Sequence, residues 1–313
     1  MNLLKKAGRP NQMPVRFERK GSLRRLAAKG FLLIVLIAAL SGCSIGSELL
    51  NDHSVEPLQK EATLRVIFLD VGQGASQLLI APSGQTLLID AGNNDKEQTM
   101  LDYLRKYGIT RLDKVIGTHP DADHIGGLDK VIDGTAIGDI YLPKASSNTK
   151  TFESLLKSIQ RKGLKVKTAK AGVQFDMGEG VRVKMVAPVK SYSDSNNMSA
   201  VVKVTYGSHS FLLTGDAESQ SEKDMMASGA DLRADVLLVG HHGSKSSTTL
   251  AFLKAVEPRY GIIQVGKDNN YGHPTPTVLQ RLKKQGVEVY RNDTQGTIEV
   301  DSDGRNLSIR TER

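Results

Sequence analysis

Residues 118–127 read Thr-His-Pro-Asp-Ala-Asp-His-Ile-Gly-Gly and place two histidines and two aspartates within six positions. The preceding run, Leu112 to Thr118, has the apolar, β-branched composition of a buried strand, and Leu128 to Ile132 has the periodicity of a helix. The cluster therefore stands where a strand passes into a helix. Gly126 and Gly127 leave the backbone of that connection free to bend.

This cluster has the composition of a metal site. So many imidazole and carboxylate groups in one loop would be electrostatically unfavourable without a cation, and both ligand types suit Zn, Mn or Fe. The alternative is an Asp-rich turn that caps a helix, and a lone His-x-Asp pattern would not distinguish the two. The complete cluster favours metal ligands at His119, Asp121, Asp123 and His124.

The first 42 residues have the composition of a targeting segment. Nine basic residues against one acidic residue precede the ten-residue apolar run Phe31 to Leu40, which is too short to span a bilayer. Leu40-Ser41-Gly42-Cys43 then resembles the lipobox of bacterial lipoproteins, whose cysteine is diacylated. We expect a signal peptide over 1–42 and a lipid on Cys43 that holds the protein at the extracytoplasmic face of a bacterial membrane. A plain anchoring or secretory segment with an incidental cysteine is the alternative.

Charge and cysteine content limit the remaining chain. Cys43 is the only cysteine, which excludes an intrachain disulfide and a thiolate ligand in the folded part. The chain has 42 basic and 34 acidic residues, and its first 42 positions contain nine of the basic residues and one of the acidic ones. The rest of the chain therefore carries 33 of each and is formally neutral. The high pI therefore gives no argument for nucleic-acid binding. We expect a flexible tether over 43–62 and one domain over 63–313.

Strand-like and helix-like patterns alternate from Thr63 onward. Two hairpins are expected, one joining Gln77–Ala81 to Thr86–Asp90 and one joining Ala200–Tyr206 to Ser210–Leu213. Helical segments stand between and after the strands. This order predicts an α+β fold of two sheets packed face to face with helices covering both.

Three further apolar strands are also followed by residues of the types that bind metal ions. LLIDAG ends on Asp90, FLLTGD ends on Asp216, and LLVGHHGSK ends on His241 and His242. Any one of these ends alone would be read as a strand-terminating turn. Together with the first cluster, they favour one shared site.

With these stretches in view, the chain resembles the metallo-β-lactamase fold family, and within it the extracellular hydrolase domain of ComEC-type DNA-uptake competence proteins. The resemblance covers about Leu64 to Ile309 and rests on FLDVGQG (68–74), THPDADHIGG, LLTGD, GHHGSK and NYGHP (270–274). It implies a four-layer αββα sandwich. It also implies the metal ligands His119, Asp121, Asp123, His124, Asp216 and either His241 or His242, with His241 preferred.

Two positions depart from these patterns. The third-motif histidine of the superfamily has no counterpart, because Asn196-Asn197-Met198-Ser199 stands there, as in the competence-type relatives. One metal ion would therefore be short of a protein ligand and more open to substrate. The acid that usually follows GQG in the competence-type proteins is Ala75.

The expected chemistry is hydrolysis by two divalent ions, Zn or Mn, about 3.5–4 Å apart, with a hydroxide held between them. Lys245 and the serines near it stand at an expected helix start, which would suit a phosphate. The remaining roles are catalysis for Asp123 and His273; substrate binding for His242, Ser244, Lys245, Asn197 and Tyr271; and orientation of metal ligands for Asp70, Gln73 and Asp90.

We therefore expect a lipid-anchored, extracytoplasmic metal-dependent hydrolase, with phosphodiesters in single- or double-stranded nucleic acid as the favoured substrate. Lys144 to Lys170 carries eight basic residues against one acid and could follow a nucleic-acid backbone, although a solvated helix face is the alternative. Cell-surface phosphodiesters, amides or esters such as a lactam or lactone, and a non-catalytic binding lipoprotein are the competing interpretations. The oligomeric state is left open.

Overall fold

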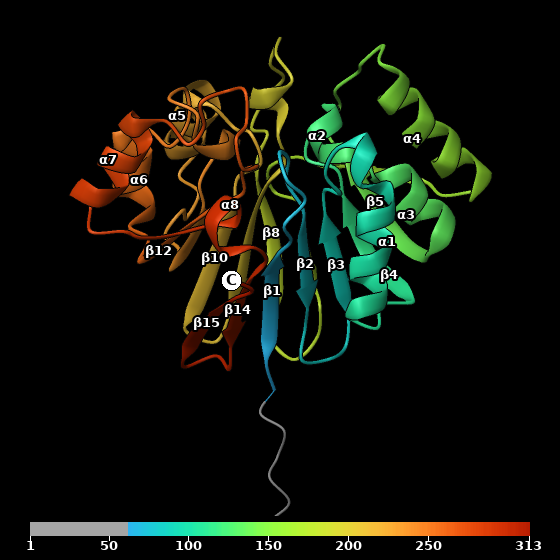
Figure 1. The fold of residues 1–313 in the computed structure, drawn as a ribbon, viewed down its shortest axis with the longest axis horizontal. Helices are drawn as coiled ribbons and strands as arrows, with labels where there is room; N and C mark the ends of the chain where they lie inside the picture. The colour runs from blue at the N-terminus through green and yellow to red at the C-terminus, as the bar shows by residue number, and fades with distance from the viewer. Residues whose placement is uncertain (1–61) are drawn as a thin grey trace, which may run out of the picture. The chain divides into compact units, whose positions relative to one another are not determined.

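The computed structural model describes residues 62–313 as two β-sheets packed face to face, with helices on the outer side of each (Figure 1). The predicted signal peptide and Cys43 lie outside these residues, as does all but the end of the predicted tether. Within the described part, no helix has the length and apolar character needed to cross a membrane.

The first sheet joins both ends of the described chain. Its eight strands run in the order β15-β14-β1-β2-β3-β4-β5-β6, antiparallel from β15 to β3 and parallel from β3 to β6. The C-terminal hairpin thus returns to pair with the first strand. The bounds are β1 Leu64–Phe68, β2 Gln77–Ile80, β3 Thr86–Ile89, β4 Arg111–Ile116, β5 Ala136–Leu142, β6 Val166–Thr168, β14 Ile298–Ser302 and β15 Leu307–Thr311.

The second sheet has seven strands in the order β13-β12-β11-β10-β9-β8-β7. Its strands are parallel from β10 to β13 and antiparallel from β7 to β10. The bounds are β7 Gln174–Asp176, β8 Arg182–Ala187, β9 Val201–Tyr206, β10 His209–Leu213, β11 Val236–Leu238, β12 Tyr260–Ile263 and β13 Glu288–Arg291.

Helices pack on the outer faces in chain order. The first sheet carries α1 Glu97–Lys106, α2 Ala122–Ile125, α3 Leu128–Gly134 and α4 Lys150–Arg161, and the second carries α5 Ser219–Ala227, α6 Leu250–Val256 and α7 Pro276–Lys284. The remaining short turns are η1 Asn94–Lys96, η2 Asn196–Met198, η3 His241–Gly243 and α8 Asn292–Gln295.

Side-chain alternation along the strands builds three apolar layers. In β1, Leu64, Val66 and Phe68 face the core between the sheets, whereas Ile67 joins the core under α1 and α3. In β10, Phe211 faces the same central core and Leu212 packs under the helices of the second sheet. Because both faces of these strands are buried over Val66–Phe68 and Phe211–Leu213, these parts of the sequence read as continuous apolar runs. The predicted α+β fold with four αββα layers is confirmed.

Candidate metal centre

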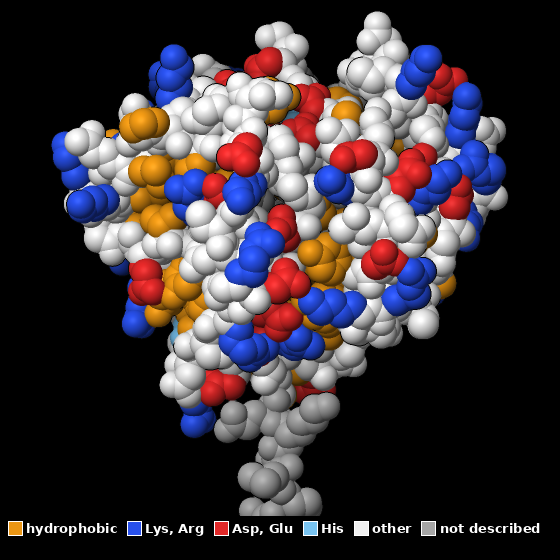
Figure 2. Space-filling model, viewed as in Figure 1, with side chains coloured by type: hydrophobic (Ala, Val, Ile, Leu, Met, Phe, Trp, Pro, Cys, Tyr) orange, Lys and Arg blue, Asp and Glu red, His pale blue; other side chains and the backbone are white. Residues whose placement is uncertain are grey.

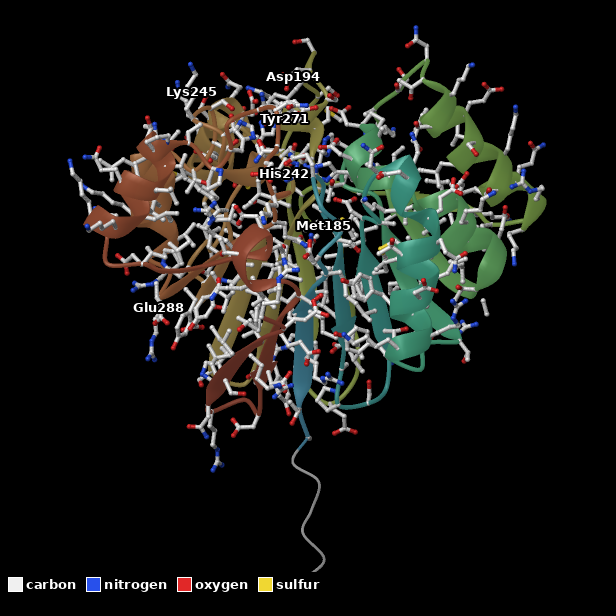
Figure 3. All side chains as sticks on the ribbon, viewed as in Figure 1. Met185, Asp194, His242, Lys245, Tyr271 and Glu288 are labelled. Carbon is white, nitrogen blue, oxygen red and sulfur yellow. The ribbon has the colours of Figure 1, made fainter. Side chains whose placement is uncertain are left out.

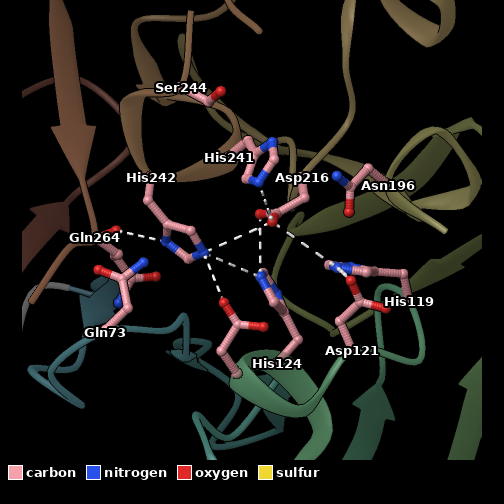
Figure 4. A network of polar contacts seen from close by, with 12 residues as sticks. Gln73, His119, Asp121, His124, Asn196, Asp216, His241, His242, Ser244 and Gln264 are labelled. Atoms are coloured by element: carbon pink, nitrogen blue, oxygen red, sulfur yellow. Dashed lines mark hydrogen bonds and ion pairs between the residues drawn. The ribbon is translucent and has the colours of Figure 1, made fainter. Parts of the chain in front are cut away.

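Strand ends from both sheets meet at one edge of the sandwich. The loop 117–121 follows β4, Asp216 follows β10, and His241 and His242 follow β11 (Figure 4). In each sheet these strands belong to the parallel part, so their carboxyl ends open on the same side, where α/β proteins bind ligands. These three separate sequence stretches are thereby brought together.

Close backbone approaches hold the first loop. A Cβ atom at Gly126 would lie 2.3 Å from the backbone nitrogen of Asn94, so only glycine fits where η1 crosses α2. A Cβ atom at Gly74 would lie 2.4 Å from the carbonyl oxygen of Asp123, and the next residue, Ala75, donates its N–H to that oxygen at 3.1 Å. The GQG turn therefore supports the loop that presents Asp123.

Four side chains form the tighter of two donor groups. Asp123, His124, Asp216 and His242 each offer one ligand atom, and these atoms lie within 4.8 Å of one another. His124 Nε2 is 3.0 Å from Asp216 Oδ1 and 3.3 Å from His242 Nε2, which is 3.2 Å from Asp123 Oδ2. Ligand bonds of about 2.0–2.2 Å in tetrahedral geometry place neighbouring ligand atoms roughly 3.3–3.6 Å apart. The group therefore has the dimensions of a site for a single cation.

Hydrogen bonds on the far side of each ring determine which nitrogen faces the group. His242 Nδ1 lies 2.8 Å from the carbonyl oxygen of Gln264, and His124 Nδ1 lies 2.7 Å from Asp90 Oδ2. Both oxygens only accept, so both Nδ1 atoms carry hydrogen and the neutral rings turn Nε2 lone pairs toward each other. Two such lone pairs beside two carboxylates require positive charge between them.

The pKa values of His124 and His242 also indicate that this group needs positive charge. Burial would lower the pKa of His124, but Asp216 and Asp90 raise it well above its usual value. Burial would also lower the pKa of His242, but Asp216 and Asp123 raise it above its usual value. Protons on these rings or a divalent cation can supply the missing charge, and a bound metal displaces the protons.

A second, looser group surrounds the other oxygen of Asp216. Asp216 Oδ2 is 3.5 Å from His241 Nε2 and 3.9 Å from His119 Nε2, which is 3.7 Å from Asp121 Oδ2. Burial and the neighbouring His124 lower the pKa of His119, which favours its neutral form. Its Nε2 is buried and has no hydrogen-bond partner among residues 62–313. A neutral, unpartnered imidazole nitrogen between carboxylates fits a metal ligand.

The adjacent histidines of GHHG face different donor groups. His241 and His242 have φ values of 50° and 53°, and this left-handed turn presents both rings to Asp216. Such a conformation costs about 1–3 kcal/mol per non-glycine residue and is characteristic of functional sites. The sequence left the choice of ligand open between His241 and His242, with His241 preferred and His242 assigned to substrate binding. In the structure His242 belongs to the tighter group, and His241, which donates Nδ1–H to Glu218 at 3.1 Å, lies beside the looser one.

Of the residues expected to orient ligands, only Asp90 contacts one directly. Its Oδ1 accepts from the backbone of Thr118 at 2.8 Å, and its Oδ2 accepts from His124. Asp70 instead accepts from Gly72 at 3.2 Å and from Arg313 at 3.0 Å, so it holds the GQG turn and the C-terminus.

The side chains of Gln73 and Asn197 hold neighbouring loops together. Gln73 Oε1 accepts the backbone N–H of Gly266 at 3.2 Å. Asn197 is 5% exposed, and its Oδ1 accepts from the backbone of Ser221 at 2.9 Å, which ties η2 to α5.

Three positions expected at the mouth of the site differ in exposure. Lys245 is exposed at the same end of the molecule as His242 (Figure 3), whereas Ser244 is nearly buried and its hydroxyl lies 2.9 Å from that of Ser246. The ring of His273 lies edge-on to that of His241, with centroids 5.7 Å apart. Burial, together with His241 and His242, lowers the pKa of His273, which favours its neutral form.

The sequence analysis did not identify two side chains that position the ligands. Glu218 accepts from His241 and from Asn196, and Ser199 Oγ lies 3.3 Å from His119 Nδ1. Both follow or precede motif residues by a few positions, but a single acid or serine in a loop carries no specific signal.

Comparisons with known proteins agree with this geometry. The metallo-beta-lactamase superfamily pattern matches residues 70–267. ComE operon protein 3 of Bacillus subtilis is 32% identical over 252 residues, which cover 75% of this chain and 32% of that protein. Competence protein ComA of Neisseria gonorrhoeae is 31% identical over 233 residues, which cover 74% of this chain and 31% of that protein. The chain thus spans about one third of the length of these relatives.

Similarity to solved structures is weaker. The metallo-beta-lactamase fold protein YhfI from Bacillus subtilis shares 15% sequence identity, with a TM-score of 0.47, over 74% of this chain and 96% of that one.

Proposed function

The chain belongs to the metallo-β-lactamase superfamily of metal-dependent hydrolases, and we propose that it hydrolyses phosphodiesters, with nucleic acid as substrate, using two divalent ions. One observation carries the proposal. Both carboxylate oxygens of Asp216 are engaged, Oδ1 by the tighter donor group and Oδ2 by both groups, as a ligand shared between two ions would be.

The donor atoms can be divided between two ions. Asp123, His124 and His242 would hold one ion, and His119, Asp121 and His241 the other, with Asp216 common to both. His241 would then supply the imidazole that the missing third-motif histidine provides elsewhere in the superfamily. When bound, a pair of divalent ions makes water nucleophilic at neutral pH and stabilises charge on attacking and leaving oxygens. The mixture of imidazoles and carboxylates suits Zn or Mn.

The chain's own residues prepare this chemistry by orientation. Asp90 and the carbonyl of Gln264 keep hydrogen on the outer nitrogens of His124 and His242, which leaves Nε2 free to bind metal. Asp216, which would be the ligand shared by both ions, is nearly buried, and its backbone N–H donates to Ser199 Oγ at 3.1 Å, which fixes the position of this loop after β10.

Two observations support a nucleic-acid substrate. One relative is named competence protein ComA and another ComE operon protein 3, and a further relative from Haemophilus influenzae, 31% identical, is named recombination protein 2. In addition, Lys144, Lys170 and Lys190 line a cavity of about 350 Å³ together with Met198. The next residue, Ser199, contacts His119. The cavity lining therefore ends one residue along the chain from a side chain that contacts a predicted metal ligand.

Ion pairs divide the basic stretch predicted from the sequence. Lys157, Arg161 and Lys167 are paired with nearby acids at 2.6–2.7 Å. Lys144 and Lys170 have no ion-pair partner among residues 62–313. Acidic and basic side chains are interspersed over the face in Figure 2, which shows no broad basic field there. Lys144 and Lys170, which line the cavity without an ion-pair partner in the described part of the chain, are thus the candidates for backbone contacts, whereas Lys190 is paired with Asp224 at 2.8 Å.

We also propose that the protein is attached to the extracytoplasmic membrane face through lipid on Cys43. The lipobox-like Leu40-Ser41-Gly42-Cys43 supports this location.

Substrate profiling tests the proposal. The full-length chain, loaded with Mn or Zn, is assayed on single-stranded DNA, duplex DNA, bis-p-nitrophenyl phosphate and a lactam, and its metal content is measured. We expect two ions per chain and hydrolysis of DNA. One ion per chain would contradict the shared role of Asp216, and hydrolysis of the lactam alone would reject the substrate assignment.

A charge-reversal pair tests the lysine cavity. Lys144→Glu with Lys170→Glu should lower DNA cleavage far more than Lys157→Glu with Lys162→Glu, which carries the same charge change on and beyond α4. Each lost phosphate contact should also reduce the salt dependence of binding by about 0.7–0.9 in log affinity against log salt. Equal cleavage by both pairs would show that the cavity does not contact DNA.

A further inference from the structure

One asparagine braces the loop that follows β12. Asn269 Oδ1 accepts the backbone N–H groups of Tyr271 and His273, each at 3.1 Å. Its Nδ2 donates to the carbonyl oxygens of Gly266 at 3.0 Å and His273 at 2.7 Å. Because these bonds use both ends of the amide, the loop presents Tyr271 in a defined position.

Aromatic rings lead from the looser donor group to solvent. The His273 ring meets His241 edge-on and lies nearly parallel to Tyr271, with a centroid distance of 5.8 Å and an interplanar angle of 23°. Tyr271 is 68% exposed, whereas the next most exposed large apolar side chain in the described part, Leu250, is 45% exposed. Figure 3 places Tyr271 between His242 and the outer end of the molecule.

This exposure serves no packing purpose in the described domain. A tyrosine ring offers large contact area at low conformational cost, and the folded domain gains little from one left mostly in water. A planar ring of the substrate would cover the exposed surface. Successive bases of single strands stack on such rings, and bases inside a duplex are already stacked on their neighbours.

We propose that Tyr271, backed by His273, is a stacking platform for an unpaired nucleobase next to the phosphodiester at the metal centre. This inference rests on the proposed nuclease function and deepens it, because it makes unpaired, base-bearing strands the substrate class. Tyr271 is a specificity residue here, and the hydroxyl has no part in the stacking.

The test compares single-stranded oligothymidylate with an oligomer of the same length built from base-free tetrahydrofuran residues. Stacking of about 1–3 kcal/mol per base corresponds to a roughly 5- to 150-fold higher kcat/KM for the base-bearing strand. In full-length Tyr271→Ala this ratio should fall to near one. Tyr271→Phe keeps the ring and should keep the ratio.

A spectroscopic measurement makes the test independent of turnover. A single-stranded oligomer with one 2-aminopurine is titrated with protein in Ca²⁺, and its fluorescence should fall with the parent and with Tyr271→Phe but not with Tyr271→Ala.

Equal kcat/KM ratios of the base-bearing to the base-free strand in the parent and Tyr271→Ala would overturn the platform while leaving the nuclease function standing. An equal loss of this ratio in the Ala and Phe variants would do the same. Equal cleavage of duplex and single strand would overturn the preference for unpaired bases. If the parent hydrolyses neither oligomer, the nuclease proposal itself is rejected, and the platform with it.

Discussion

Replacing Asp90 by asparagine tests how the domain keeps its metal-binding nitrogens free. Asp90 is buried, and its two oxygens accept the Thr118 backbone N–H at 2.8 Å, the Thr118 hydroxyl at 2.7 Å and His124 Nδ1 at 2.7 Å. Asparagine has nearly the same shape but only one oxygen. Because its amide nitrogen donates, one of these partners must lose its acceptor.

Each orientation of the new amide has a distinct cost. If its oxygen stays on the Thr118 N–H, the NH₂ group faces His124 Nδ1 and drives the hydrogen to Nε2, the atom 3.0 Å from Asp216. Loss of such an orienting partner typically weakens metal binding 10- to 100-fold, or about 1.4–2.7 kcal/mol. If the amide turns over, two N–H groups face each other, and the buried, unsatisfied donor costs about 1–3 kcal/mol of folding stability.

Calorimetric titration of the full-length chain with Zn or Mn, with thermal unfolding recorded in chelator, separates the two outcomes. We expect one of two ions to bind 10- to 100-fold more weakly in Asp90→Asn, with a small change in unfolding temperature. Asp113→Asn is a matched control, because Asp113 accepts from the backbone of Thr86 at 3.0 Å in the same sheet and contacts no histidine. Unchanged affinity for both ions in Asp90→Asn would refute the argument that this carboxylate sets the tautomer.

Three other predictions follow from the site, the leader and the surface. His119→Ala should lose metal and hydrolysis while unfolding stays cooperative, since the ligand sits on a pre-built strand end; full activity, with metal content measured in parallel, would reject its assignment. Cys43→Ser should move the protein from the membrane to the soluble fraction without changing its specific activity, and unchanged fractionation would assign the anchor to residues 31–40. Burial would raise the pKa of Glu299, but the Tyr107 hydroxyl and two arginines lower it from 4.5 to about 2. Its carboxylate therefore stabilises the fold fully above pH 4.5, and this contribution is lost as pH falls toward 2. The difference in unfolding free energy between the parent and Glu299→Gln should shrink over that interval, and a constant difference would contradict the coupling.

Local sequence patterns were sufficient for the fold wherever strands are buried on both faces. β3, β10 and β11 carry continuous apolar runs, and each ends on a polar residue at the metal centre. The edge strands β7 and β15 were not predicted, because β7 has only three residues and the alternation in β15, with Leu307 and Ile309 toward the core, extends over only five. Their pairing with β8 and β14 supplies what the local pattern lacks.

The residue types at the candidate metal centre could be predicted from local sequence, because each follows an apolar strand near a glycine. The contacts that each side chain makes depend on the tertiary structure. His241 and His242 are neighbours of one type, and their roles separate because a left-handed backbone turns one ring to Gln264, 22 residues away, and the other to Glu218, 23 residues away. Asp90 likewise reaches His124 across 34 positions, whereas Asp70 pairs with the C-terminus. Side-chain orientation depends on hydrogen bonds between distant segments, and no local pattern encodes those partners.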